Sequence, residues 1–175
     1  MIKEWDRGYV QVYTGDGKGK TTAALGLALR AAGAGLHTFI AQFVKGMEYS
    51  ELRALKRFPE VEIRRYGRAC FIDREPQPED IDAARTGLRE AHEQLVSREW
   101  DIVVLDEANI ATHYGLFPVE ELLKMVEDKP EDLELVITGR CADQRVLEAA
   151  DLVTEMCEVK HYYERGVGCR KGIEN

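Results

Sequence analysis

Short apolar runs alternate along the chain with longer segments of helical periodicity. The apolar runs are rich in β-branched and aromatic residues, which favour strands, and they lie at 9–13, 36–43, 61–66, 102–105, 133–138 and 152–158. Segments with helix-forming composition or with apolar residues three or four positions apart predict helices, and they cover 21–32, 50–57, 80–98, 119–126 and 144–149. This alternation predicts βαβ units. We therefore expect an α/β fold, with a mainly parallel sheet and helices on both faces.

A glycine-rich segment joins the first predicted strand to the first predicted helix. Residues 14–22 read Thr-Gly-Asp-Gly-Lys-Gly-Lys-Thr-Thr and end in the Gly-Lys-Thr of the phosphate-binding pattern G-x-x-x-x-G-K-[ST]. Thr14 occupies the first glycine position of that pattern, and the glycine follows one place later, at Gly15. Glycines allow successive backbone N–H groups to point at an anion, and the helix that follows adds its positive end. We expect a nucleoside triphosphate here.

Several side chains of this loop suit a metal-bound triphosphate. Lys20 supplies a positive charge to the phosphates and is a candidate catalytic residue, while Thr21 offers a hydroxyl to Mg²⁺ or Mn²⁺. Thr22 offers a second hydroxyl, and Lys18 is an additional cation. The expected nucleotide-binding set is Gly15, Asp16, Gly17, Lys18, Gly19, Lys20, Thr21 and Thr22. The alternative is a glycine-rich turn that binds no ligand.

Two carboxylates, Asp106 and Glu107, follow the apolar run at 102–105. In phosphate-loop proteins an aspartate at this place lies beside the metal. We predict that Asp106 binds the metal, usually through water, and that Glu107 holds metal, orients a water or positions the substrate. The alternatives are a helix-capping Asp106 and a surface Glu107. Arg140 follows the strand predicted at 133–138, where it either contacts a phosphate or carboxylate or lies in a plain turn.

Composition narrows the possible partners. The 175 residues fit one domain, 1–175, and the formal net charge of −8 argues against a general nucleic-acid binder. No apolar run is long enough to span a bilayer, and the charged N-terminal segment lacks the centre of a signal peptide, which predicts a cytoplasmic protein. The four cysteines show no C-x-x-C spacing, so we expect reduced thiols rather than a zinc site.

These motifs belong to a wider set of segments, which are 12–24, 42–46, 103–107, 135–140, 159–161, 166 and 172–174. In this set the chain resembles the corrinoid adenosyltransferases of the phosphate-loop type, also called ATP:cob(I)alamin adenosyltransferases. The resemblance covers nearly the whole chain. It implies a three-layer sandwich like that of P-loop NTPases of the RecA type. It also implies an enzyme that transfers the 5′-deoxyadenosyl group of ATP to the cobalt(I) of a corrinoid and releases triphosphate, in adenosylcobalamin biosynthesis or salvage.

The resemblance further implies substrates and partners. The implied corrinoid is cobalamin, cobinamide or a cobyrinic acid derivative, and a separate reductase is expected to supply the electrons. In this family ATP lies in the loop in the reverse of the usual direction, and homodimers are common. Because cobalt(I) is itself the nucleophile, Glu107 is not required as a general base. Phe71 is the candidate for covering the lower face of the corrin ring, with a core position as its alternative. Gln42 and Lys45 either reach substrate or are ordinary strand-end residues, and His161 is structural or orients substrate.

Two other interpretations of the motifs stay open. A phosphate-loop small-molecule kinase or NTP hydrolase would transfer or release a phosphoryl group. A non-catalytic protein would only bind a nucleotide or a corrinoid. Analysis of the products separates all three.

Overall fold

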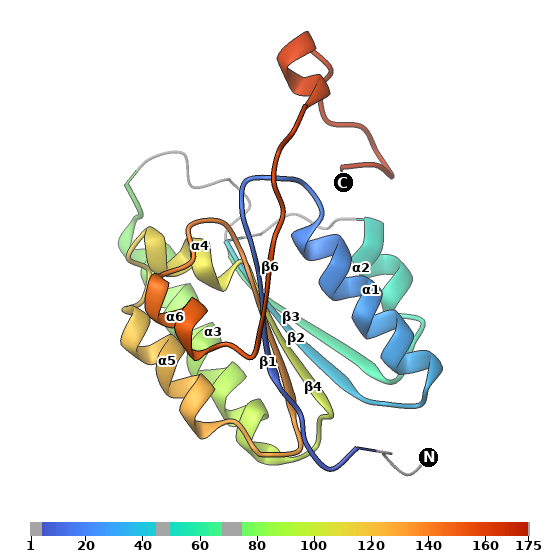
Figure 1. Cartoon of the computed structure of the whole chain (residues 1–175), viewed down its shortest axis with the longest axis vertical. Coiled ribbons are helices and arrows are strands. Elements are labelled where there is room, and N and C mark those ends of the chain that lie inside the picture. Colours follow the sequence, from blue (N-terminus) through green and yellow to red (C-terminus); the bar gives the residue numbers. More distant parts are fainter. Residues whose placement is uncertain (1–4, 45–49, 68–74, 175) are drawn as a thin grey trace.

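Six strands form one parallel sheet in the order β3-β2-β4-β5-β1-β6. The computed structural model describes residues 5–44, 50–67 and 75–174 (Figure 1). The strands are β1 (Val10–Thr14), β2 (Thr38–Phe43), β3 (Val61–Tyr66), β4 (Ile102–Asp106), β5 (Glu134–Thr138) and β6 (Leu152–Glu155). The strand nearest the N-terminus thus lies between the last two strands of the chain.

Helices cover both faces of this sheet, which confirms the α/β prediction. They are α1 (Lys20–Gly33), α2 (Ser50–Leu55), α3 (Pro78–Ser97), α4 (Ala108–His113), α5 (Val119–Asp128) and α6 (Gln144–Ala149), with a 3-10 turn η1 (Tyr162–Arg165). Figure 1 shows α1 and α2 on one face and α3, α4, α5 and α6 on the other. In the part of the chain that the structure describes, none of the helices combines the length and apolarity needed for a bilayer span.

The sheet separates two apolar cores, because side chains of successive strand residues point to opposite faces. The core between the sheet and α1 contains Ile40, Val104 and Val136 together with Ala24 and Ala28. The core on the other face contains Phe39, Val103, Leu105, Leu135 and Ile137 together with residues of α3 and α5. All five residues of β4 are buried, as expected for a strand that helices cover on both sides.

The observed elements differ from the predicted ones in a few places. The strand predicted at 152–158 ends at Glu155, because the chain then leaves the sheet and crosses the loop that follows β1. The six-residue helix α4 was not predicted, and no side-chain capping bond marks its start. The helix predicted from Asp80 begins earlier, at Pro78, where Gln77 and Asp80 form a capping box.

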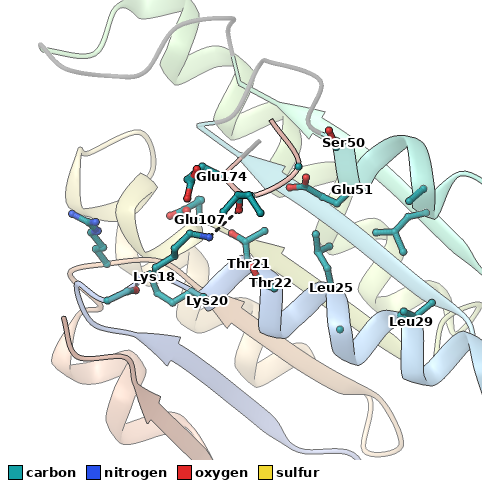
Figure 2. A pocket seen from close by; sticks show the side chains of 18 of the residues that line it. Lys18, Lys20, Thr21, Thr22, Leu25, Leu29, Ser50, Glu51, Glu107 and Glu174 are labelled. Carbon is teal, nitrogen blue, oxygen red and sulfur yellow. Dashed lines mark hydrogen bonds between the residues drawn. The ribbon is translucent and has the colours of Figure 1, made fainter. Parts of the chain in front are cut away.

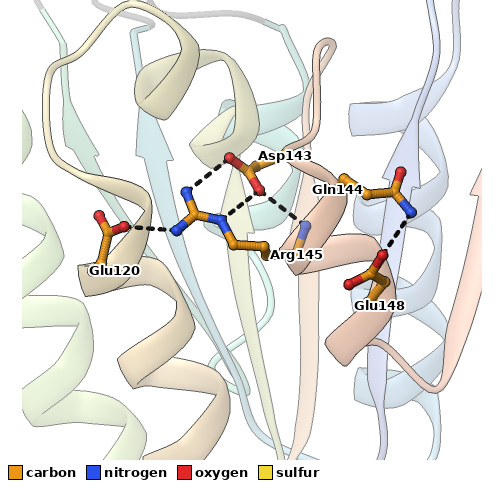
Figure 3. A network of polar contacts seen from close by, with 5 residues as sticks. All are labelled: Glu120, Asp143, Gln144, Arg145 and Glu148. Atoms are coloured by element: carbon orange, nitrogen blue, oxygen red, sulfur yellow. Dashed lines mark hydrogen bonds and ion pairs between the residues drawn. The ribbon is translucent and has the colours of Figure 1, made fainter.

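Helices α5 and α6 are joined by a polar network around Arg145 (Figure 3). Its guanidinium donates to Glu120 of α5 at 2.7 Å and to Asp143 at 3.0 Å, and Asp143 also accepts from the backbone N–H of Arg145 at 2.9 Å. These side chains are largely exposed, so the network adds little stability. Its effect is to fix the start of α6, and with it the segment that connects β5 to α6.

Helix α3 packs on the end of β3 without space for a side chain at position 87. A Cβ added to Gly87 would lie 2.2 Å from Cγ of Tyr66. The Tyr66 hydroxyl donates to Glu90 of the same helix at 2.8 Å. Burial, followed by the effect of Glu90, raises the pKa of Tyr66, so the phenol stays protonated. Gly87 therefore allows the contact that anchors the end of β3.

We expect Gly87→Ala to destabilise the protein by about 1–3 kcal/mol, because the methyl group forces Tyr66 or α3 to move. Denaturant unfolding measures this change. Gly26→Ala in α1 is the matched control, since a Cβ there meets no atom within 4 Å. That control should stabilise the protein by up to about 1 kcal/mol through helix propensity. Equal effects of the two changes would contradict the close packing at Gly87.

Candidate functional site

The loop between β1 and α1 turns at two glycines with left-handed backbone. Gly15 has φ 89° and Gly19 has φ 122°, a region that side chains disfavour. Thr14 is still part of β1 and pairs with Glu155 of β6. The turn therefore starts one residue later than in the common pattern, which explains why glycine stands at 15 rather than at 14.

The segment after β6 passes directly over this loop. The backbone N–H of Gly17 donates to the carbonyl of Met156 at 2.6 Å. A Cβ at Gly15 or at Gly17 would lie 2.5 or 2.6 Å from the same carbonyl oxygen. Both glycines are therefore required by the close approach of residue 156, in addition to any role in anion binding.

Lys20 is the first residue of α1 and is only 7% exposed. Its ammonium donates to the carbonyl oxygens of Gly15 at 2.6 Å and of Gly17 at 2.7 Å. The charge is thus held inside the loop and largely away from bulk water, where its attraction for an anion is stronger than at the surface. This geometry agrees with the predicted phosphate contact, which stays a prediction.

The carboxylate of Asp106 is completely buried and accepts three hydrogen bonds from side chains. Thr21 and Thr138 donate to Oδ1 at 2.9 and 2.7 Å, and Nε2 of Gln42 donates to Oδ2 at 3.0 Å. The fold therefore brings Thr21 and Asp106 together, as the sequence predicted. The alternative of a helix-capping Asp106 is wrong, because the residue before α4 is Glu107 and its side chain makes no capping bond.

This donor set fits a magnesium ion that is bound mainly through phosphate. Mg²⁺ prefers oxygen ligands and commonly takes one or two side chains, with phosphates and waters as the rest. The Thr21 hydroxyl and the Asp106 carboxylate offer such oxygens, and Oε1 of Gln42 beside them is buried without a hydrogen-bond donor among the described residues. Within the same residues, no group of three or more His, Cys, Asp or Glu side chains is arranged to hold a metal.

The chain turns sharply where the central strands end. Val44, Glu107 and Cys141 have φ values of 62°, 63° and 54°, which non-glycine residues adopt rarely. Such conformations cluster at functional sites, because the surrounding structure must hold them in place. For Glu107 that hold includes the bond from its backbone N–H to Oγ1 of Thr138 at 3.0 Å. Its side chain lines the pocket described next, so it is not an ordinary surface residue.

A pocket of about 760 Å³ opens above the loop, between α1, α2 and the C-terminal segment. Its volume is in the range of ligand sites in proteins. Figure 2 shows Lys18, Thr21 and Glu107 at its polar end, with Leu25 and Leu29 farther along α1. Among the sequence-predicted residues, the lining contains Asp16, Gly17, Lys18, Gly19, Lys20, Thr21, Thr22, Glu107, Arg140 and His161. Gly15 and Asp106 lie behind this wall, where they shape the loop and hold Thr21.

Residues 156–174, called the tail here, form one wall of this pocket through Glu158, His161, Gly172, Ile173 and Glu174. Nζ of Lys18 donates to the carbonyl of Ile173 at 3.0 Å. Hydrogen bonds from Arg170 and Tyr162 lower the pKa of Glu174 to about 2, so this carboxyl stays ionised. The sequence identified the tail only through the family resemblance and assigned it no role beyond His161.

Gln42 does not line the pocket; it lies buried beneath it and contacts Asp106. Phe71 and Lys45 lie outside the described residues. Cys141, Cys157 and Cys169 are free and exposed, in agreement with the expected thiols.

The amino-acid sequence is similar to a known protein family and to several of its members. Residues 6–175 match the family described as ATP:corrinoid adenosyltransferase BtuR/CobO/CobP. A corrinoid adenosyltransferase of Pseudomonas aeruginosa is 36% identical over 171 residues, which cover 97% of this chain and 84% of the relative. The corrinoid adenosyltransferases of Escherichia coli K12 and Salmonella typhimurium are 36% and 34% identical over 169 residues, covering 97% of this chain and 86% of each relative.

Proposed function

Because the chain belongs to the ATP:corrinoid adenosyltransferase family, and is an enzyme that transfers the adenosyl group of ATP to a corrinoid, we propose a direct displacement at the 5′ carbon of ATP. The electron pair of cobalt(I) forms the cobalt–carbon bond. The bond from the 5′ carbon to oxygen breaks, and its electrons leave with intact triphosphate. Cobalt is thereby oxidised formally from cobalt(I) to cobalt(III) in the product. The cobalt(I) form of the substrate is supplied beforehand by a separate reductase.

The buried ammonium of Lys20 inside a glycine loop is the observation that carries this proposal. The departing triphosphate is a polyanion, and preorganised positive charge stabilises it as it forms. The loop amides other than that of Gly17, whose N–H is bonded to Met156, complete the binding of the phosphates together with Lys18 and Thr22, and they hold the 5′ carbon in line with the incoming cobalt. Since cobalt(I) needs no activation by a base, Glu107 contributes by positioning.

The cation site is also part of the proposal. Thr21, Asp106 and Glu107 would hold Mg²⁺ or Mn²⁺ beside the triphosphate. When bound, the cation supplies positive charge that offsets the charge of the leaving group. The Thr21 hydroxyl donates to Asp106 at 2.9 Å, which places a hydroxyl oxygen and a carboxylate side by side and supports this arrangement.

Further proposals concern the setting of the enzyme. We infer that residues 1–175 act as one domain, that the protein is a cytoplasmic homodimer, and that its corrinoid is cobalamin, cobinamide or a cobyrinic acid derivative. The free, exposed thiols of Cys141, Cys157 and Cys169 fit a reducing compartment, and the one sheet that the described strands form fits one domain.

An anaerobic incubation with ATP, Mg²⁺ and chemically reduced cobalamin tests the reaction. We expect a light-sensitive adenosyl-corrinoid and one triphosphate for each molecule formed. Release of ADP or phosphate without adenosyl-corrinoid would favour the kinase or hydrolase interpretation. Nucleotide binding without any product would favour a non-catalytic binding protein.

The corrinoid side of the site is tested at Phe71. We expect Phe71→Ala to lower kcat/KM for cobalamin by about tenfold or more, as for truncation of an aromatic ring that packs on its ligand. ATP affinity, measured in the absence of cobalamin, should stay within a factor of about two, which is below one kcal/mol. A parallel loss of both quantities would indicate that Phe71 belongs to the core instead.

A further inference from the structure

Tyr162 and Arg170 surround Glu174 in the last part of the tail with a set of hydrogen bonds, called the bracket here. The backbone N–H of Arg170 donates to Glu174 at 2.8 Å, and the guanidinium of Arg170 donates to it at 3.2 Å. The Tyr162 hydroxyl also donates to this carboxylate, and the Arg170 guanidinium lies 4.8 Å from the centre of the Tyr162 ring. One carboxylate thus ties η1 to the final turn of the described chain.

This bracket presents a backbone carbonyl to the phosphate loop. Ile173, the residue before Glu174, accepts from Nζ of Lys18. Lys18 is exposed, and a lysine side chain without a partner samples many conformations in water. An ammonium carries three donors, so the bond to Ile173 leaves two of them for a phosphate. The tail therefore holds the Lys18 ammonium over the pocket, and two of its N–H donors remain available to a ligand.

The tail meets the loop at a second point, where the carbonyl of Met156 accepts from Gly17. The two contacts lie at opposite ends of the tail, and the residues between them are mostly exposed. Val159, for example, is 96% exposed. The tail is therefore not part of either apolar core. Its contacts with the loop explain its position better than packing does.

We propose that Glu174 is a positioning residue for the triphosphate, acting through Ile173 to hold Lys18 over the phosphate loop. This inference rests on the proposed function, because it assigns the pocket to the triphosphate of ATP. The bracket keeps the tail closed on the loop, so that Lys18 is already in place when the nucleotide arrives.

Whether Glu174→Gln strengthens or weakens the binding of triphosphate separates a positioning role of Glu174 from a purely electrostatic one. Glu174 is an anion that lines the pocket, so its charge alone repels triphosphate. If it acted only through that charge, Glu174→Gln would bind triphosphate more tightly. If it positions Lys18, the same change breaks the bracket and binding becomes weaker.

The experiment uses inorganic tripolyphosphate with Mg²⁺ as the probe and titration calorimetry on the full chain without corrinoid. We expect Glu174→Gln to raise the Kd by about tenfold, by analogy with residues that orient metal ligands, whose loss costs about 10- to 100-fold in affinity. Glu164→Gln is the matched control, since Glu164 lies in η1 of the same tail and the change of charge is identical. That control should stay within a factor of about two.

A double-mutant cycle with Lys18→Met completes the test. We expect Glu174→Gln to have little further effect in the Lys18→Met background, because the two residues act as one unit. Amide hydrogen exchange should show faster exchange at 158–174 in Glu174→Gln, with an unchanged midpoint of global unfolding. Unchanged or tighter tripolyphosphate binding in Glu174→Gln, or full additivity with Lys18→Met, would overturn the proposal. A wild-type protein that forms no adenosyl-corrinoid would instead count against the proposed function.

Discussion

Lys20→Ala is expected to lower the rate of adenosylation by roughly 10²–10³-fold or more, as for removal of a preorganised group that stabilises developing charge. The change removes the buried ammonium that, in the proposed reaction, stabilises the leaving triphosphate. It also removes the two hydrogen bonds that the ammonium donates to the carbonyls of Gly15 and Gly17. The loop then loses both its buried positive charge and the hydrogen bonds that connect its two ends. Single-turnover adenosylation at saturating cobalamin measures this loss directly.

Lys18→Met provides the comparison. Lys18 is exposed and donates to the tail, while Lys20 is buried in the loop. We expect Lys18→Met to raise the ATP concentration needed for half-maximal rate and to change the maximal rate much less. A wild-type rate in Lys20→Ala would remove the loop from the reaction. A larger loss in Lys18→Met than in Lys20→Ala would reverse the roles assigned to the two lysines.

Asp106→Asn is expected to have the second largest effect. The carboxylate accepts from Thr21, Thr138 and Gln42, whereas an amide offers one acceptor oxygen and turns an N–H group toward a donor. A buried donor without an acceptor costs about 1–3 kcal/mol, so the free energy of unfolding should fall by that amount. The Mg²⁺ concentration for half-maximal rate should rise by about 10- to 100-fold, as for loss of a group that orients a metal ligand.

Thr138→Val is the control that separates these two effects. It removes one hydrogen bond to Asp106 and leaves the carboxylate in place. It also leaves the backbone N–H of Glu107 without its acceptor, so stability should fall by a similar amount. The Mg²⁺ dependence should change much less than in Asp106→Asn. An unchanged Mg²⁺ titration in Asp106→Asn would exclude Asp106 from the metal site.

The part of the site that local sequence determines was predictable. The strand before Gly15, the glycine loop and the helix from Lys20 follow one another along the chain, and each has a strong local signal. The place of Asp106 at the end of an apolar run follows from the same reasoning. The sequence also predicted that Thr21 and Asp106 serve the same metal ion, which requires the two side chains to lie close together.

Contacts between distant segments were not predictable. Gln42 meets Asp106 only because β2 lies beside β4, and the sequence does not state this strand order. Similarly, Met156 lies on Gly17, 139 positions earlier, because β6 pairs with β1. No periodicity encodes such pairings. The role of the tail, which depends on them, became visible only in the folded protein.

The place of β1 between β5 and β6 also decides how late in translation the glycine loop can complete its folded contacts. The backbone N–H of Val10 bonds to the side chain of Asp151, 141 residues later. At about 5–20 residues per second, a ribosome needs on the order of 10 s to make the intervening chain. For most of that time the emerging polypeptide carries the complete glycine loop but lacks both neighbours of the strand that supports it. The loop therefore acquires the contacts seen in the folded protein only after residues 134–156 have been made.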